Sequence, residues 1–410
     1  MTRTKDFACG IAILLAMGAV NVLHADFGRP AGPKDVPELL RTAAGETVTT
    51  REQWERVRRP ELVKTFQECE YGVRPVERPD DLRFELVRPV EEAFGGRAVK
   101  KTVRGMYSGP GGSASFVFAA WIPKSARKVP AFLHLSPRPA DTAADIDGPR
   151  KCYYLPADYI TSRGYAAIAS CDYDFTPDTH LFPDAPTSGV FKVFGPKLMS
   201  AREPSDWGIV SAWAWGASRI MDWIGTEPTI DAAHVGVVGL SRNGKTALCA
   251  AAFDTRFAMA VSCCSGCCGA KLNHMKCLES ERIEHIVDGA SRWFCPALTR
   301  WVRRDFEMPF DQHEWLALIA PRLLYVSSAV EDAWAGPRGE FASACLASPV
   351  WELYGKAGLV AHGFPPPDRP LQAGHVGYHV RSGIHDITRF DWENYLDFAD
   401  GHGWRFGSAD

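Results

Sequence analysis

Short apolar segments separated by glycine and proline recur through the middle and the second half of the chain. Apolar or alternating runs of this kind are typical of strands. We expect strands at residues 114–122, 131–135, 165–170, 235–239, 257–263, 323–327 and 376–380. The patterns at residues 206–223 and 243–253 predict helices between them. Strands that alternate with helices imply a mostly parallel sheet covered on both faces, so the sequence predicts an α/β protein, a three-layer αβα sandwich.

The segments outside this pattern are predicted to be helical or irregular. Residues 26 to about 60 are polar and proline-rich, and Thr50 before Glu52 is typical of a capped helix start. Residues from about 269 to 311 lack clear strands, and we expect a helical excursion over one face there. No internal repeat, linker or break in composition is visible, so residues 26–410 are predicted to be one domain with an N-terminal lead-in segment.

The N-terminus has the order of a signal peptide. Arg3 and Lys5 precede a mostly apolar run from Phe7 to Leu23, and Ala25 is a small residue at a plausible cleavage point. The run is short for a membrane span, and polar, proline-rich sequence follows it. We expect removal of residues 1–25, a secreted or periplasmic protein, and no membrane span in the mature chain.

Composition and charge narrow the class of partner. The chain has 410 residues, of which 46% are hydrophobic and 23% charged, as in ordinary globular proteins. A formal net charge of −3 without long Lys or Arg runs provides no basic surface for nucleic acid. We expect a small or neutral partner molecule, no nucleic acid, and a monomer.

Twelve cysteines fit an oxidising compartment, where they can pair. Four of them form a cluster, Cys263, Cys264, Cys267 and Cys268. No second Cys-x-x-Cys or His-x-x-x-His follows downstream, which favours structural disulfides or buried thiols over a metal site. Cys295 is a candidate disulfide partner for the cluster.

A predicted strand that ends near Gly239 continues through a Gly-x-Ser turn into a predicted helix, the context of a nucleophile elbow. Such a turn exposes the hydroxyl of Ser241 at the carboxyl edge of the sheet, and the backbone amide of Arg242 would face an oxyanion. A strict Gly-x-Ser-x-Gly motif is absent, because Asn243 precedes Gly244. The alternative is a serine that merely caps an ordinary helix.

Partners for a catalytic serine follow in the expected order. In proteins with such an elbow, the acid and then the base lie on loops after late strands. Asp332 and His385 each follow a late predicted strand, and the base needs the acid to fix its tautomer. Glu331 is an alternative acid and His379 an alternative base. His379 alternates with apolar neighbours as a core histidine would, whereas His385 lies on a turn.

Four sequence motifs resemble those of the glucuronoyl esterases, carbohydrate esterase family fifteen: residues 239–245, 213–219, 311–322 and 383–387. The similarity extends from about Thr50 to Phe398. It implies the α/β-hydrolase fold and one catalytic domain over residues 26–410. Members cleave the ester between 4-O-methyl-glucuronic acid on xylan and lignin alcohols, without metal or cofactor. The implied substrate is therefore glucuronoxylan or a lignin–carbohydrate ester.

Carried over by position, the resemblance assigns roles to individual residues. It makes Ser241 the nucleophile, His385 the base and Arg242 an oxyanion-stabilising residue. The substrate-binding residues that it implies are Lys245, Glu279 and Trp334. A helix that starts at the elbow places Lys245 one turn beyond the nucleophile on the same side, within reach of sugar hydroxyls.

This sequence departs from the family pattern at three places. Cys264 stands where many members have a glutamate, and a thiol cannot serve as the acid. Some bacterial members have the acid at the position of Asp332, which is our assignment. Leu240 and Asp386 stand where the family often has a linked pair of cysteines, so that disulfide is missing. Residues 133–139 replace the Gly/Asn-rich loop usual near the oxyanion site.

Two other functions fit the sequence. They are another carbohydrate esterase, such as one that deacetylates xylan, and a non-catalytic sugar-binding member. Arg242 and Lys245 suit an acidic sugar and speak against the first alternative. The thiol of Cys264, at a position where many members have a carboxylate, favours the second alternative. The presence of Asp332 and His385 argues against it.

Overall fold

The computed structural model describes residues 36–125, 127–140, 154–178, 188–195, 202–275, 279–290 and 292–404. The signal peptide predicted over residues 1–25 lies outside the described residues, and the single domain over residues 26–410 stays a prediction. Among the described helices, none is both long and apolar enough to cross a membrane.

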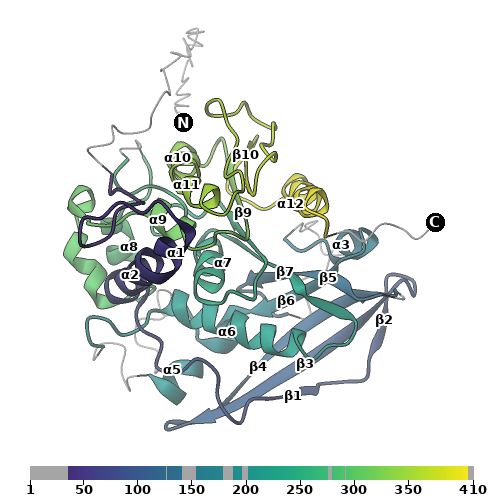
Figure 1. Ribbon diagram of the computed structural model, residues 1–410. Coiled ribbons are helices and arrows are strands. Elements are labelled where there is room, and N and C mark those ends of the chain that lie inside the picture. Colours follow the sequence, from purple (N-terminus) through teal and green to yellow (C-terminus); the bar gives the residue numbers. More distant parts are fainter. Residues whose placement is uncertain are drawn as a thin grey trace, which may run out of the picture.

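The strands form one ten-stranded mixed sheet, in the order β1-β3-β4-β6-β5-β7-β8-β9-β10 with β2 paired to β3. The antiparallel half contains β1 (Arg83–Leu86), β2 (Glu91–Ala93), β3 (Ala98–Gly109) and β4 (Gly112–Pro123). The parallel half contains β5 (Val129–Ser136), β6 (Ala166–Cys171), β7 (Ile230–Leu240), β8 (Met259–Cys263), β9 (Leu323–Ala329) and β10 (Val376–Arg381). The long antiparallel strands form the lower part of the molecule in Figure 1.

Helices cover both faces of the sheet, which confirms the three-layer α/β-hydrolase prediction. On one face, α6 (Ile209–Ile224) and α7 (Arg242–Phe253) pack side by side, with α9 (Gln312–Ala317) and α10 (Pro337–Ala347) beyond them (Figure 1). On the other face lie α3 (Ala157–Ser162) and α12 (Arg389–Gly401). Successive strand residues alternate between the two faces. Val237 therefore belongs to the core under α6 and α7, and Val238 to the core under α3 and α12.

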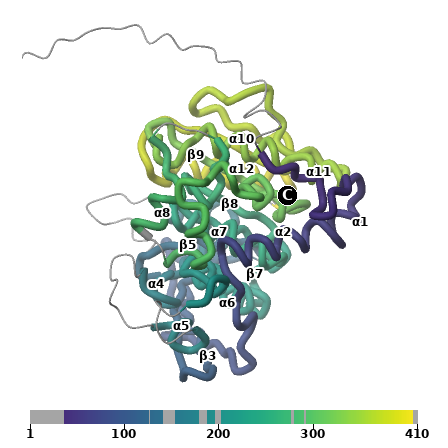
Figure 2. Tube along the Cα trace, turned by 90° about the vertical axis from the view of Figure 1, so that its left-hand side faces the viewer, coloured from purple at the N-terminus to yellow at the C-terminus, as the bar shows by residue number. Residues whose placement is uncertain are grey.

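The lead-in segment folds against the α7 face. The expected capped helix start is confirmed at α1 (Arg51–Gln53), where Thr50 and Gln53 form a capping box. The π-helical segments η1 (Trp54–Arg58) and η2 (Gln67–Tyr71) flank α2 (Arg59–Phe66), which lies beside α9 and α7 (Figure 2).

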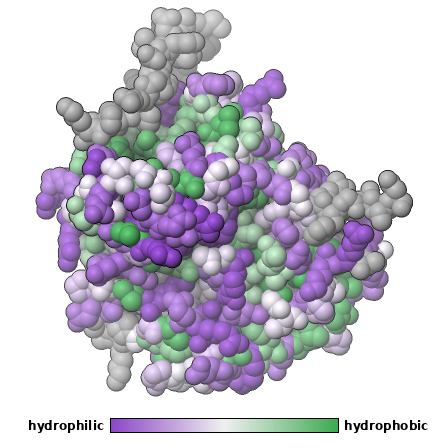
Figure 3. Space-filling model, viewed as in Figure 1, coloured by the Kyte–Doolittle hydropathy of each residue, from purple (hydrophilic) through white to green (hydrophobic). Residues whose placement is uncertain are grey.

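The remaining helices are short. They are α4 (Asp172–Phe175), α5 (Gly189–Phe194), α8 (Ile283–Ala290), the 3₁₀ segments η4 (Pro296–Trp301) and η5 (Asp305–Glu307), and α11 (Pro349–Glu352). The described part of residues 269–311 contains helices and no strand, as expected. On the face seen in Figure 3, hydrophilic residues predominate and hydrophobic ones are scattered in small groups.

The cysteines differ from one expectation. The nine that the structure describes carry free thiols, and the cluster at residues 263–268 is buried, which confirms buried thiols. The suggested pairing of Cys295 with this cluster is wrong, because its thiol lies 3.9 Å from the carbonyl oxygen of Glu68 instead. Because no disulfide forms among the described cysteines, they give no evidence for an oxidising compartment.

Candidate active site

The carboxyl ends of four neighbouring parallel strands, β7, β8, β9 and β10, meet at one edge of the sheet. Ser241 directly follows β7, and Cys264 directly follows β8. Asp332 and His385 lie on the loops that follow β9 and β10, within four residues of the strand ends. The topology therefore brings together, at one edge, four side chains that are far apart in the sequence.

Ser241 lies on a sharp turn between β7 and α7, with φ 60° and ψ −126°. This conformation is strained for a residue with a side chain. A Cβ on Gly239 would lie 2.0 Å from the carbonyl oxygen of Asn243, and one on Gly244 would lie 2.9 Å from the Cβ of Ser265. Glycine at both positions lets the first turn of α7 approach the strands closely. The geometry is that of a nucleophile elbow, with Gly244 one place later than in the strict motif.

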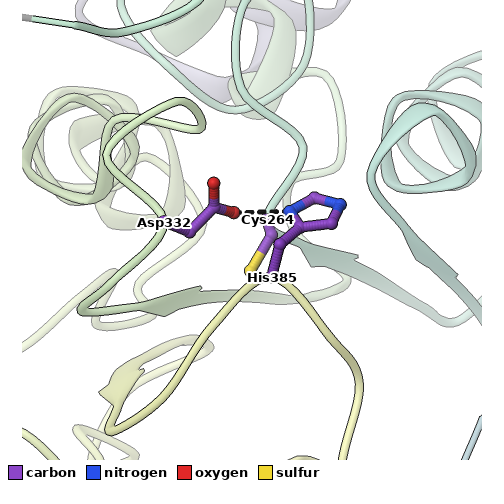
Figure 4. A group of neighbouring side chains, drawn as sticks. All are labelled: Cys264, Asp332 and His385. Carbon is purple, nitrogen blue, oxygen red and sulfur yellow. Dashed lines mark hydrogen bonds and ion pairs between the residues drawn. The ribbon is translucent and has the colours of Figure 1, made fainter. Parts of the chain in front are cut away.

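Asp332 and His385 face each other from their two loops (Figure 4). The His385 Nδ1 lies 2.5 Å from the Asp332 Oδ2, and the backbone N–H of Ala335 donates to the other carboxylate oxygen at 3.2 Å. The Asp332 side chain is 4% exposed and that of His385 41% exposed. Burial is the largest single effect and acts to raise the pKa of Asp332, but the hydrogen bond and charge of His385, together with the Ala335 N–H and the Cys264 thiol, lower that pKa overall. A buried anion thus orients an imidazole that solvent can reach.

The Ser241 hydroxyl makes no hydrogen bond to His385 in the part of the chain that the structure describes. Nucleophile and base are often farther apart before substrate binds than during the reaction.

The two alternative residues lie elsewhere. Glu331 is exposed, and its backbone N–H donates to the carbonyl oxygen of Gly383 at 3.1 Å. His379 is buried, with Nε2 2.9 Å from the Asp391 carboxylate and Nδ1 3.0 Å from the hydroxyl of Tyr325. Both ring nitrogens of His379 are therefore used inside the core, as expected for a structural histidine.

A buried glutamate fixes the loop that carries Cys264. The Cys264 N–H donates to the carbonyl oxygen of Ser327 at 2.7 Å, with φ 46° at Cys264. The next two N–H groups, of Ser265 and Gly266, both donate to Oε1 of Glu340, at 2.7 and 3.0 Å. Burial raises the pKa of Glu340 to about 7 despite these hydrogen bonds. Cys264 is thereby held next to Asp332 and His385.

Arg242 places a cation beside the elbow. Its guanidinium forms an ion pair with Asp178 and lies 5.1 Å above the Trp293 ring, and the Trp293 Nε1 donates to Asp178 at 2.9 Å. As the first residue of α7, Arg242 has a backbone N–H without a partner inside the helix. This N–H and the positive end of the helix dipole both lie next to Ser241.

Lys245 is buried one turn further along α7. Its ammonium lies 2.7 Å from the carbonyl oxygen of Ser265, contacts that of Cys267, and lies 2.7 Å from Oε2 of Glu281. Burial is the largest single effect and acts to lower the pKa of Lys245, but the charge and hydrogen bond of Glu281, together with the nearby thiols of Cys267 and Cys268, raise that pKa overall. An ammonium has three N–H donors, and these three acceptors use all of them. Lys245 therefore holds Glu281 in place.

The two other predicted sugar contacts are exposed. Trp334, 49% exposed, follows Asp332 closely, and its ring lies 4.8 Å from that of His285. The Trp334 carbonyl oxygen accepts from the Glu281 N–H at 2.7 Å. Glu279 is exposed with φ 63°, and the glutamate that the structure brings to Lys245 is Glu281.

The chain is similar in sequence and fold to known carbohydrate esterases. A sequence model of the family described as "Glucuronyl esterase, fungi" matches residues 200–355. "Carbohydrate esterase MZ0003", from an unknown prokaryotic organism, is 32% identical over 394 residues, which cover 90% of this chain and 89% of that protein. The glucuronoyl esterase structure from Solibacter usitatus is 35% identical, covers 90% of this chain and 98% of its own, and superposes with a TM-score of 0.79. The chain belongs to the glucuronoyl esterase family, carbohydrate esterase family 15.

Further similarities mark the range of this family. The structure described as a promiscuous family 15 esterase from a marine bacterial metagenome is 31% identical, with 90% and 96% coverage and a TM-score of 0.79. The 4-O-methyl-glucuronoyl methylesterase of Podospora anserina is 33% identical over 156 residues, which are 36% of this chain and 32% of that protein. Similarity to the Podospora protein is thus confined to about a third of the chain, whereas the 4-O-methyl-glucuronoyl methylesterase of Schizophyllum commune is 27% identical over 361 residues, which cover 84% of this chain and 81% of that protein.

Sequence reasoning missed three residues of this glucuronoyl esterase family member: Asp178, Glu281 and Glu340. Each is a carboxylate that pairs with a site residue or its loop from a distant segment. Glu281 had a usable signal, because a buried lysine after the nucleophile needs an acidic partner. Asp178 and Glu340 had none, since only the tertiary structure brings them to the site.

Proposed function

We propose that this protein is a serine esterase that cleaves the ester between the carboxyl group of glucuronic acid, or its 4-O-methyl form, on glucuronoxylan and a lignin alcohol. The observation that carries the proposal is the 2.5 Å hydrogen bond from His385 to buried Asp332, at the sheet edge where Ser241 forms a strained elbow. Family membership supports the substrate, since several relatives are named 4-O-methyl-glucuronoyl methylesterases.

The proposed reaction passes through an acyl-enzyme. His385 removes the proton of the Ser241 hydroxyl as its oxygen attacks the ester carbonyl, and Asp332 stabilises the imidazolium that forms. The Arg242 N–H and the N-terminus of α7 stabilise the oxyanion. Protonated His385 then gives its proton to the leaving alcohol. A water molecule, deprotonated by His385, then attacks the acyl carbonyl; the bond to the Ser241 oxygen breaks, His385 returns the proton to that oxygen, and the free uronate leaves. Apart from the ester and water, these steps use side chains and backbone groups of the protein.

We propose that the sugar lies against Trp334 and Glu281. A half-exposed indole offers a flat apolar surface to a sugar ring, and a carboxylate accepts hydrogen bonds from its hydroxyls. Lys245 contributes by holding Glu281, because its own three donors are occupied. The Arg242 cation favours the uronate that hydrolysis produces. A direct contact of Glu279 with the sugar stays a prediction from the family resemblance.

The substrate assignment is tested by offering benzyl glucuronate and acetylated xylan to the purified protein. We expect release of glucuronic acid and little release of acetate. Acetate release alone would make the protein a different carbohydrate esterase. If the folded protein hydrolyses neither substrate, this result would favour a non-catalytic sugar-binding member.

We also propose export, with cleavage near Ala25, and a monomeric state. N-terminal sequencing of protein collected outside the cytoplasm tests the first, and sedimentation velocity tests the second. An N-terminus at Met1 or a dimeric mass would contradict them.

A further inference from the structure

A thiol, a carboxylate and an imidazole converge at the active-site edge. Each residue offers one ligand atom: the sulfur of Cys264, a carboxylate oxygen of Asp332 and a ring nitrogen of His385. These three atoms lie within 4.8 Å of one another. Figure 4 shows the Cys264 side chain between the two partners of the hydrogen bond. Cys264 plays no part in the proposed reaction, so its position in this cluster calls for a separate account.

The three ligand types match those that zinc-class cations prefer. Zinc binds cysteine thiolate at about 2.3 Å and histidine nitrogen or carboxylate oxygen at about 2.0–2.2 Å, usually in a tetrahedron. Ligand atoms at these distances lie roughly 3.5 Å apart. The three atoms lie within 4.8 Å of one another, and the His385 Nδ1 and Asp332 Oδ2, now 2.5 Å apart, must separate by about 1 Å to reach this spacing. Rotation of the half-exposed His385 ring supplies this movement.

Cys264 and Asp332 are buried and held in place, whereas His385 is exposed to solvent. Cys264 and Asp332 are 2% and 5% exposed, and backbone hydrogen bonds to Ser327 and Ala335 hold their loops. Glu340 fixes the two residues after Cys264. His385 faces solvent, with 41% of its side chain exposed. A cation can therefore enter past His385 and meet two ligands that are already positioned.

We propose that Cys264, Asp332 and His385 form an inhibitory binding site for a zinc-class divalent cation. On binding, the thiol releases its proton to solvent and the thiolate, a carboxylate oxygen and an imidazole lone pair replace water molecules around the ion. The thiolate and imidazole select zinc, cobalt or cadmium over magnesium and calcium, which prefer oxygen ligands. Coordination occupies the base and the acid of the triad, so Ser241 loses its proton acceptor and hydrolysis stops until a chelator removes the ion.

Cobalt(II) titration tests the site without using turnover. A cobalt ion bound to thiolate gives a charge-transfer band in the near ultraviolet. We expect one such cobalt ion per chain in the wild-type protein, displaced by zinc. Cys264→Ala should abolish the band, whereas Cys345→Ala, which removes a thiol on α10 outside the cluster, should retain it. Circular dichroism confirms that both variants are folded, and Cys264→Ser provides a second removal of the ligand.

Inhibition of ester hydrolysis by zinc is the second readout, measured with 4-nitrophenyl acetate so that it does not depend on the uronate substrate. The zinc concentration that halves each protein's own rate should rise at least about tenfold in Cys264→Ala and stay unchanged in Cys345→Ala. Absence of a thiolate band in the wild type, or an equal band in Cys264→Ala, would overturn the proposal. Neither outcome depends on whether the protein hydrolyses glucuronate esters.

Discussion

Replacing Asp332 by asparagine removes the negative charge that orients and stabilises His385, while leaving the shape of the side chain almost unchanged. The carboxylate is buried, and its oxygen lies 2.5 Å from the imidazole nitrogen. Two unit charges about 4 Å apart at an effective dielectric constant near 20 attract by roughly 4 kcal/mol, which corresponds to about 10³ in rate. Loss of the correct imidazole tautomer adds to this, so kcat should fall by roughly 10³–10⁴-fold.

The assay is steady-state hydrolysis of benzyl glucuronate, with thermal unfolding of each protein to show that the fold persists. Glu331→Gln is the matched control, because that side chain is an exposed neighbour on the same loop. Its kcat should stay within about twofold of the wild type, as expected for a surface substitution. A folded Asp332→Asn protein with near-wild-type kcat would refute the assignment of the acid, and so would an equal loss in Glu331→Gln.

Three further predictions follow from the same geometry. Gly239→Ala should destabilise the protein by about 1–3 kcal/mol and lower kcat, because its Cβ would collide with Asn243. The control is Gly401→Ala, where a Cβ meets nothing within 4 Å, and it should change neither quantity. Urea unfolding measures the stability, and steady-state kinetics measure kcat. Glu281→Gln should raise KM for benzyl glucuronate about tenfold or more by weakening a charged hydrogen bond; a rise in Glu279→Gln alone would contradict this. Buried Glu70 has a pKa raised from 4.5 to about 8, so the native state holds a proton that the unfolded state loses. The free energy of unfolding should therefore fall as pH rises through this interval, by up to about 1.4 kcal/mol per unit, and less steeply in Glu70→Gln.

The meeting of Ser241, Asp332 and His385 at one edge of the sheet was predictable because its signals are local. The elbow at Ser241 needs a strand, a glycine and a helix start, all of which adjoin in the sequence. Asp332 and His385 follow strands whose apolar patterns are clear, and parallel strands must bring their carboxyl ends to one edge. The alternation of apolar neighbours around His379 is typical of a core histidine, and this distinguished it from His385.

The antiparallel half of the sheet shows where pattern alone was insufficient. Apolar runs indicated strands in this region, but they do not encode direction. β3 and β4 are separated by only Pro110 and Gly111, and so short a connection permits only a hairpin. Taking this turn into account would have predicted the antiparallel pair, and with it the antiparallel part of the mostly parallel sheet.

The surroundings of the proposed sugar-binding residues depend on contacts that no local pattern contains. The Lys245 ammonium is occupied by carbonyl groups of Ser265 and Cys267 from the loop after β8, and by Glu281 beyond it. Spacing along α7 predicted that Lys245 lies on the side of Ser241, but it could not show that the Lys245 donors are already used. The same limit applies to Cys295, whose surroundings are set by the fold rather than by its spacing from the cysteine cluster.

The most direct test of the central claim is release of glucuronic acid from benzyl glucuronate by the wild-type protein and by Ser241→Ala, compared at equal concentration and with matched thermal stability. We predict that the wild type releases glucuronic acid and that Ser241→Ala is slower by at least about 10³-fold, because the nucleophile is lost. Equal rates in the two proteins, or no release by the wild type, would contradict a uronate esterase that acts through Ser241.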